Sequence, residues 1–280
     1  MKLINQILDR GDKKPILWDA YFNKNSKQKP LIIFCHGYKG FKDWGAWYKV
    51  AESFAEEDFF FVKFNFSHNG GTIKQPIDFP DLEAFGQNNY SKELNDLADI
   101  INFFTNPSFE YIDQIDVNAI VLIGHSRGGG IAIIKASEDP RIKKLITWAS
   151  VSSFGKRSST TGDLVQWKED GVKYITNGRT KQQMPHYYQF YEDYISNEKR
   201  FDIERCSKAL KIPHLILHGT NDSAVLFEEG ENLAHWSLKA ELVALKDTDH
   251  VFNTKHPWDE NNFPKAFLEL IKKSIEFTKR

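Results

Sequence analysis

The sequence predicts an α/β fold in which a mostly parallel, twisted sheet carries helices on both faces and a small inserted cap. Two observations predict the sheet: apolar runs of strand length recur along the 280-residue chain, and segments with helical spacing separate them. A third observation predicts the cap, because residues 152–206 interrupt this alternation with polar and aromatic sequence. We therefore expect an α/β core made of residues 1–151 and 207–280, with the cap inserted between its two parts.

In the first half of the chain, turn-forming residues at 9–12 separate two apolar-rich runs and predict an antiparallel hairpin. The next run is apolar throughout, which is typical of a strand buried on both faces. The expected elements are the hairpin strands at 1–8 and 15–22, strands at 30–35, 59–66, 119–123 and 144–149, helices near 47–54 and 91–104, and a long surface loop at 72–90.

The second half begins with the cap. Asn177-Gly178 is a strong signal for a two-residue type I′ turn, here between expected strands at 171–176 and 179–182. A helical stretch rich in tyrosine follows at 187–195. The α/β pattern then resumes with strands at 213–218 and 240–245 and helices at 227–236 and 263–277.

The strand that ends at Ile123 leads into Gly124-His125-Ser126-Arg127-Gly128, a match to G-x-S-x-G. This pattern is typical of a sharp strand-to-helix turn that exposes a nucleophilic serine. A side chain at Gly124 or Gly128 would collide with the neighbouring strand or helix, and the N–H groups of the helix start would surround the serine hydroxyl. The five residues alone also fit a glycine-rich turn with a solvated serine.

Further polar residues follow the ends of other strands. Asp222 comes after one strand and His250 after the next, and the carboxyl ends of parallel strands meet at one edge of the sheet. A serine hydroxyl becomes a good nucleophile only when a neighbouring imidazole takes its proton, and a carboxylate must orient that imidazole. Asp247 and Asp249 lie nearer to His250 in sequence, but adjacent residues on a turn usually point apart.

The order of nucleophile, acid and base along the whole chain resembles the serine hydrolases of the α/β-hydrolase superfamily. Together with the elbow, His36-Gly37-Tyr38 resembles the cinnamoyl/feruloyl-esterase-like and dienelactone-hydrolase-like members, and peptidases of the prolyl oligopeptidase type share much of this pattern. The resemblance implies Ser126 as nucleophile, Asp222 as acid and His250 as base.

The same resemblance implies an oxyanion hole formed by the backbone N–H groups of Tyr38 and Arg127. His68 follows a strand end, and Tyr187 and Tyr191 lie in the cap, so all three could line the substrate pocket. The alternative is that His68 is a hydrogen-bonded loop residue and that the tyrosines serve in packing, as an aromatic stripe at helical spacing more often does.

The expected activity is hydrolysis of carboxylic esters, most simply small soluble ones, through an acyl-enzyme on Ser126. A peptidase, an acylaminoacyl hydrolase or a thioesterase of the same fold is an alternative, and so is a non-catalytic protein that uses the pocket to bind a ligand. No cofactor is expected. No metal is expected either, because the chain contains neither HExxH nor a His/Asp cluster at ligand spacing.

Composition narrows the class of partner. The net charge is −1, from 37 basic and 38 acidic residues, and no long block of like charge occurs. Nucleic acid and an anionic membrane surface are therefore not expected partners. No apolar stretch has membrane-spanning length, the first residues do not form a signal peptide, and two cysteines do not make a disulfide framework. We expect a cytoplasmic location; the sequence does not predict the oligomeric state.

Overall fold

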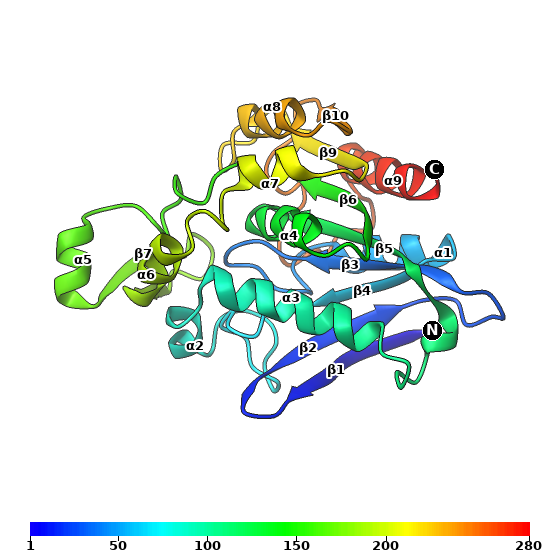
Figure 1. The fold of residues 1–280 in the computed structure, drawn as a ribbon, viewed down its shortest axis with the longest axis horizontal. Helices are drawn as coiled ribbons and strands as arrows, with labels where there is room; N and C mark the ends of the chain where they lie inside the picture. Colours follow the sequence, from blue (N-terminus) through cyan, green and yellow to red (C-terminus); the bar gives the residue numbers. More distant parts are fainter.

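Eight strands form one twisted sheet in the order β1-β2-β4-β3-β5-β6-β9-β10, in a computed structural model that describes all 280 residues (Figure 1). Every neighbouring pair from β4 to β10 is parallel, whereas β1 with β2 and β2 with β4 are antiparallel. The strands are β1 (Lys2–Arg10), β2 (Lys13–Tyr21), β3 (Lys29–Cys35), β4 (Phe60–Phe64), β5 (Ile115–His125), β6 (Ile142–Trp148), β9 (His214–Gly219) and β10 (Ala240–Leu245). The predicted mostly parallel sheet and its N-terminal hairpin are thus confirmed.

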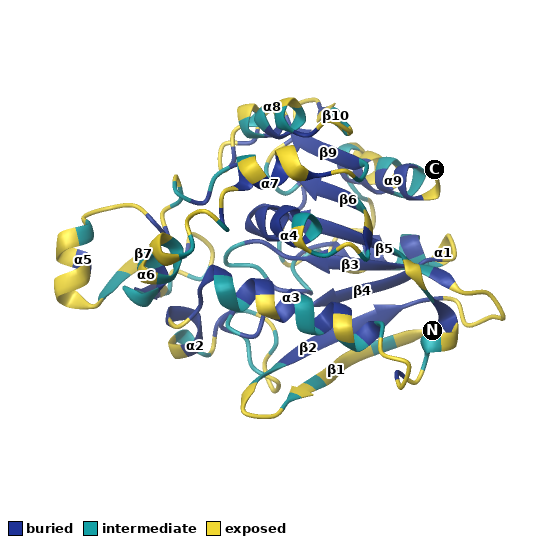
Figure 2. Cartoon of the chain, viewed as in Figure 1, coloured by how far each residue is buried: buried dark blue, intermediate teal, exposed yellow.

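Helices cover both faces of this sheet, as predicted, because the central strands are apolar on both sides. In β3, Ile32 and Phe34 face one core cluster, whereas Leu31 and Ile33 face the other. The first cluster lies under α1 (Trp47–Glu56) and α9 (Lys265–Lys279), and the second lies under α3 (Tyr90–Phe104), α4 (Arg127–Glu138), α7 (Ile203–Ala209) and α8 (Phe227–Trp236). Figure 2 shows the central strands buried, whereas the edge strand β1 is largely exposed.

Helix α1 illustrates why these segments are helical. Its buried residues Trp47, Val50, Ala51 and Phe54 recur at intervals of three and four and therefore form one stripe. Each large side chain buried in this way contributes about 1.5–3 kcal/mol relative to an exposed one. None of the helices combines the length and the apolar character that crossing a lipid bilayer requires.

The expectation of an uninterrupted surface loop at 72–90 is wrong. Helix α2 (Leu82–Gly86) lies within it, and the carboxylate of Asp81 caps this helix by accepting a hydrogen bond from the Ala84 N–H at 2.9 Å. Phe79 and Phe85 are buried. These two aromatic residues anchor a segment whose proline, glycine and aspartate content alone indicated a loop.

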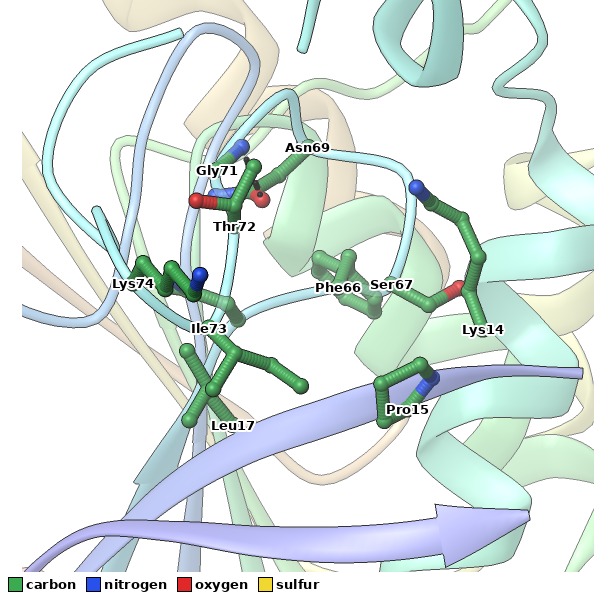
Figure 3. A pocket seen from close by; sticks show the side chains of 11 residues that line it. Lys14, Pro15, Leu17, Phe66, Ser67, Asn69, Gly71, Thr72, Ile73 and Lys74 are labelled. Atoms are coloured by element: carbon green, nitrogen blue, oxygen red, sulfur yellow. Dashed lines mark hydrogen bonds between the residues drawn. The ribbon is translucent and has the colours of Figure 1, made fainter. Parts of the chain in front are cut away.

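The first part of the same connection encloses a cavity. Residues 65–74 follow β4 and pass over the end of β2, and the cavity between them has a volume of about 420 Å³ (Figure 3). Phe66, Ile73 and Leu17 contribute apolar surface to it, whereas Lys14 and Lys74 lie at its rim.

Between β6 and α7 the chain leaves the sheet for residues 149–202, which we call the inserted segment. It contains α5 (Leu164–Asp170), the antiparallel pair β7 (Val172–Thr176) and β8 (Gln183–Tyr187), and α6 (Gln189–Ser196). Figure 1 shows α5, β7 and α6 projecting beyond one end of the sheet. Helix α5 was not predicted, and α7, which includes Cys206, packs against α4 of the core. The division into a core and a cap at residues 152–206 stays a prediction.

The turn between β7 and β8 also differs from the expectation. Residues 177–182 form a six-residue loop and not a two-residue type I′ turn. The Asn177 side chain accepts hydrogen bonds from the N–H groups of Arg179 and Thr180, and Lys181, with φ 61°, takes the left-handed conformation. The asparagine side chain therefore organises a wider turn, and the glycine beside it does not need a positive φ.

Candidate active site

Ser126 occupies the turn between β5 and α4, and its backbone is strained. Its φ of 57° and ψ of −121° lie outside the regions that side-chain-bearing residues usually adopt. A Cβ on Gly124 would lie 2.4 Å from the Gly128 carbonyl oxygen, and one on Gly128 would lie 2.4 Å from the Cys35 carbonyl oxygen. Both glycines are therefore required for the close approach of strand, turn and helix, in agreement with the sequence argument.

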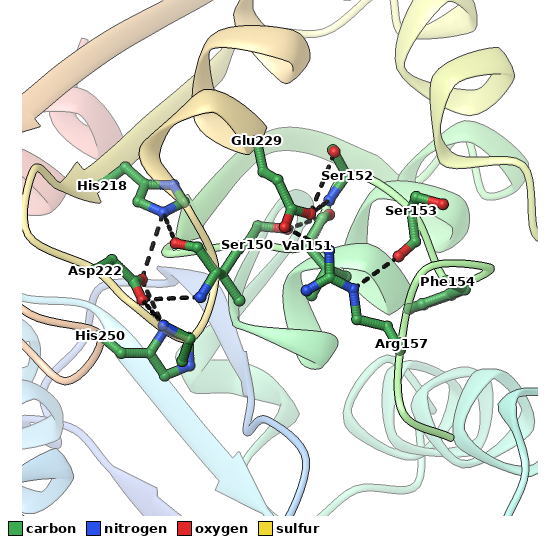
Figure 4. A network of polar contacts seen from close by, with 12 residues as sticks. Ser150, Val151, Ser152, Ser153, Phe154, Arg157, His218, Asp222, Glu229 and His250 are labelled. Carbon is green, nitrogen blue, oxygen red and sulfur yellow. Dashed lines mark hydrogen bonds and ion pairs between the residues drawn. The ribbon is translucent and has the colours of Figure 1, made fainter. Parts of the chain in front are cut away.

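The loops that follow β9 and β10 are joined directly, which brings Asp222 and His250 together. The Asn221 N–H donates to the Thr248 carbonyl at 3.0 Å, and a Cβ on Gly219 would lie 2.2 Å from the same oxygen. As a result, His250 Nδ1 lies 2.7 Å from Asp222 Oδ2 (Figure 4). The two residues come from neighbouring strand ends, as the sequence order predicts.

The Asp222 carboxylate is held from several sides. Its Oδ1 accepts hydrogen bonds from the N–H groups of Ala224 and Val225, both at 2.9 Å, and His218 Nε2 lies 3.4 Å from Oδ2 (Figure 4). Burial by itself would raise the pKa of Asp222. Hydrogen bonds from His218, His250 and the Val225 N–H, together with the charge interaction with His250, outweigh burial, so the pKa of this carboxyl lies below its usual range. Asp222 is therefore ionised at neutral pH.

Asp247 and Asp249 do not contact the His250 ring. The Asp249 carboxylate accepts hydrogen bonds from the N–H groups of Val251 and Asn253 and so closes its own turn. The Asp247 N–H donates to the Thr220 hydroxyl at 2.9 Å. Of the three candidate acids, Asp222 alone is placed to orient the imidazole.

Ser126 and His250 border the same cavity, which has a volume of about 280 Å³, and a smaller space of about 130 Å³ adjoins both residues on the side of Trp44 and Trp47. The His250 side chain is 22% exposed and so remains accessible from the cavity. The Ser126 hydroxyl makes no hydrogen bond within the chain. The hydrogen bond between a catalytic serine and its histidine base often forms only when substrate binds.

The loop after β3 runs directly against the serine. A Cβ on Gly37 would lie 2.8 Å from the Ser126 Cβ. His36 fixes this loop: its Nδ1–H donates to the Gly37 carbonyl at 2.9 Å, and its Nε2 accepts from the Phe66 N–H at 3.2 Å. Burial lowers the pKa of His36 to about 4, so the ring is neutral and can play both roles. The next backbone N–H, that of Tyr38, has no hydrogen-bond partner within the chain.

Arg127 is the first residue of α4, so its N–H belongs to the helix start and has no partner within the helix. His125, on the other side of the serine, donates from Nε2 to the His250 carbonyl at 2.9 Å. Burial lowers the pKa of His125 to about 3, and the ring stays neutral. His125 thus positions the backbone of His250.

Sequence reasoning used only the backbone of Tyr38 and Arg127 and missed what their side chains do. The Arg127 guanidinium lies 4.2 Å from the centre of the Tyr38 ring and pairs with the buried Glu93 at 3.4 Å. The Tyr38 hydroxyl forms a 2.9 Å hydrogen bond with Nε2 of His186 in β8. The inserted segment is therefore tied to the loop beside Ser126.

The three residues expected to line the substrate pocket lie elsewhere. The His68 ring bonds the Ser67 hydroxyl at 2.8 Å, Tyr187 packs over α2 and donates to Glu83, and Tyr191 packs against Trp167. None of them borders the cavities at Ser126. The packing alternative describes them better, and from the inserted segment Phe154 and Arg157 line the larger cavity instead.

Known proteins resemble this chain in sequence and in fold. The family model described as the α/β hydrolase fold matches residues 30–191. A Mycoplasma genitalium protein named "Putative esterase/lipase 2" is 23% identical over 291 residues, covering 96% of this chain and 98% of its own length. Among solved structures, Est1E from Butyrivibrio proteoclasticus has a TM-score of 0.71 at 16% identity, with 98% of both chains covered. A structure described as a "Putative Dienelactone Hydrolase" from Klebsiella pneumoniae has a TM-score of 0.62 at 14% identity, covering 100% of this chain and 98% of its own.

Proposed function

The chain belongs to the α/β-hydrolase fold family and is esterase-like, and on this premise we propose that it is a serine hydrolase that cleaves small carboxylic esters through an acyl-enzyme on Ser126. One observation carries the proposal. His250 is hydrogen-bonded to the ionised Asp222 at 2.7 Å and borders the same cavity as Ser126, which occupies a strained strand-to-helix turn. Packing alone does not require this combination of base, acid and cavity-lining hydroxyl.

In the proposed first step, Ser126 Oγ attacks the ester carbonyl carbon while His250 Nε2 takes the hydroxyl proton. The Asp222 carboxylate accepts the Nδ1–H of His250, which fixes the tautomer with a free lone pair on Nε2 and stabilises the imidazolium that forms. The carbonyl oxygen becomes an oxyanion, for which we propose the N–H groups of Tyr38 and Arg127 as donors. Loss of one such donor typically costs about 10²–10³ in rate.

The tetrahedral intermediate collapses when the bond to the alkoxy oxygen breaks and His250 returns its proton to the leaving alcohol. Water then attacks the acyl-enzyme with the same assistance, and the products are one carboxylic acid and one alcohol. No cofactor takes part in these steps. We propose the inserted segment as the cap that shapes the acyl site, because Phe154 and Arg157 border the cavity.

The test is hydrolysis of 4-nitrophenyl acetate by the wild-type protein beside Ser126→Ala, with labelling by a fluorophosphonate probe. We expect turnover and labelling by the wild type and neither by the variant. Turnover by Ser126→Ala at the wild-type rate would remove Ser126 from the mechanism, and a wild type that neither reacts with the probe nor hydrolyses any ester would leave a non-catalytic binding role. An aminoacyl-anilide and an acyl thioester in parallel decide between esterase, peptidase and thioesterase. The cytoplasmic location stays a prediction.

A further inference from the structure

The cavity at Ser126 is lined by three basic side chains and by no acidic one. Lys39, Arg127 and Arg157 border it. The remaining lining is mostly apolar, including Val151, Phe154 and Val225. A recess with apolar walls and only positively charged side chains concentrates a positive potential, which attracts anions.

Two of these three cations have carboxylate partners inside the protein. Arg127 pairs with Glu93 at 3.4 Å, and Arg157 pairs with Glu229 and donates to the Ser153 carbonyl at 3.0 Å. Figure 4 shows that the Arg157 guanidinium faces the Glu229 carboxylate. These contacts satisfy much of the charge of the two arginines, so their net contribution to ligand recognition is reduced.

Lys39 has no such partner. Its ammonium forms no ion pair and no hydrogen bond within the chain, and its one charge contact is with the Tyr38 ring, whose centre lies 5.0 Å from Nζ. The Arg127 guanidinium lies over the same ring at 4.2 Å. Two cations therefore share one aromatic side chain, and no carboxylate lies beside the lysine.

This arrangement costs free energy in the unliganded protein. Burial, followed by repulsion from Arg127, lowers the pKa of Lys39, and its backbone φ of 54° lies in the left-handed region that side-chain-bearing residues seldom occupy. Lys39 also borders the smaller space on the other side of Ser126 and His250, so it adjoins both halves of the site. An anion held here would supply the missing partner.

We propose that Lys39 recognises a carboxylate of the substrate, so that the preferred substrates are esters that carry a carboxylate in addition to the ester bond. The inference rests on the proposed esterase activity and adds the substrate class. The acyl half of such a substrate would be a dicarboxylic acid joined to an alcohol through one of its carboxyl groups. In the other case the carboxylate belongs to the alcohol half, and both cases place it beside the Lys39 ammonium.

Two matched pairs of substrates test the proposal and separate these cases. Mono-4-nitrophenyl adipate and 4-nitrophenyl hexanoate have acyl chains of equal length and differ in the terminal carboxylate. 3-Acetoxybenzoate and 3-acetoxybenzamide differ in charge on the alcohol side. We expect kcat/KM to be about 10-fold higher for the anionic member of at least one pair, which is the size of effect that one partly screened charge pair produces. The ratio should fall at high salt.

The variants assign the preference to Lys39. Lys39→Met should lower the ratio of anionic to neutral kcat/KM about 10-fold, and Lys39→Arg should restore most of it. Lys74→Met is the matched control, because Lys74 borders the separate cavity of Figure 3 and shares no wall with the site; it should leave the ratio unchanged. Circular dichroism checks that each variant is folded.

A wild type with no anionic preference in either pair overturns the proposal, as does a Lys39→Met variant that keeps the wild-type ratio. Both outcomes leave the esterase function intact, because the neutral esters are still hydrolysed and Ser126→Ala is inactive. If no ester is hydrolysed at all, the proposed function fails. Calorimetry then decides whether Lys39 holds a carboxylate: it compares the affinity for monomethyl adipate of Ser126→Ala with that of the Ser126→Ala, Lys39→Met double variant. Equal affinities refute it.

Discussion

The hydrogen bonds of Asp222 allow the effect of Asp222→Asn on catalysis to be predicted in detail. Oδ1 of Asp222 accepts two backbone N–H groups, from Ala224 and Val225, and Oδ2 faces Nδ1 of His250. In the asparagine variant the amide oxygen must keep the backbone donors, because the amide nitrogen would oppose two N–H groups there. The amide nitrogen then faces His250 Nδ1. Since two donors cannot share a hydrogen bond, the imidazole must present a lone pair at Nδ1 and carry its proton on Nε2.

That tautomer cannot accept the Ser126 proton. The equivalent change in the template serine protease triad lowers kcat about 10⁴-fold, which corresponds to about 5.4 kcal/mol in the activation free energy. We expect the same size of loss here. The effect should appear in kcat more than in KM, because the interaction strengthens as the imidazolium forms.

The assay is steady-state hydrolysis of 4-nitrophenyl acetate at neutral pH, with thermal unfolding as the check on structure. Asp249→Asn is the matched control, since this carboxylate accepts only the N–H groups of its own turn, from Val251 and Asn253. We expect its kcat to stay within a few-fold of the wild type. Near-normal activity in Asp222→Asn together with an inactive Asp249→Asn would refute the assignment of the acid.

Three further changes probe the fold around the site. Gly128→Ala places a Cβ 2.4 Å from the Cys35 carbonyl oxygen and should cost about 1–3 kcal/mol of unfolding free energy in urea, whereas Gly178→Ala, whose Cβ meets nothing within 4 Å, should cost far less. Burial lowers the pKa of His214 to about 3, so only the unfolded chain gains this proton as the pH falls below about 6.5, and the free energy of unfolding falls toward acid pH. His214→Gln should reduce that slope by up to about 1.4 kcal/mol per pH unit, and an unchanged slope would refute this. Tyr38→Phe removes the hydrogen bond to His186 and should lower kcat/KM about fivefold, matching about 1 kcal/mol; an unchanged value would show that this link does not position the loop.

The sequence could predict the elbow and the order of the polar residues because both depend on local constraints. Gly124 and Gly128 are required wherever a strand, a sharp turn and a helix approach within van der Waals contact. Parallel strands bring their carboxyl ends to one edge, so the placement of Asp222 beside His250 follows from topology. The sequence favoured Asp222 over Asp249 because adjacent residues on a turn usually point apart, and in the structure the Asp249 carboxylate accepts the N–H groups of its own turn.

The inserted segment was predicted less well, because its structure depends on contacts distant in sequence. Asn177-Gly178 favours a tight turn, but the Asn177 side chain binds Arg179 and Thr180 and widens the loop. The tyrosines have the spacing of both a packing stripe and a pocket wall, and hydrophobic periodicity cannot separate the two. Only the partners decide: Tyr187 meets Glu83 and α2.

The same limit explains why reaction class and substrate class are encoded so differently in this chain. The proposed reaction depends on Ser126, Asp222 and His250, whose types and order carry the chemistry. The proposed substrate recognition depends on charge balance, and a lysine in the sequence gives no sign of whether a carboxylate faces it. Arg127 looks as basic as Lys39 in the sequence, yet only the arginine has a buried glutamate beside it. The unpaired lysine becomes visible only when the charged side chains around the cavity have been assigned their partners, and there we propose that the substrate supplies the missing charge.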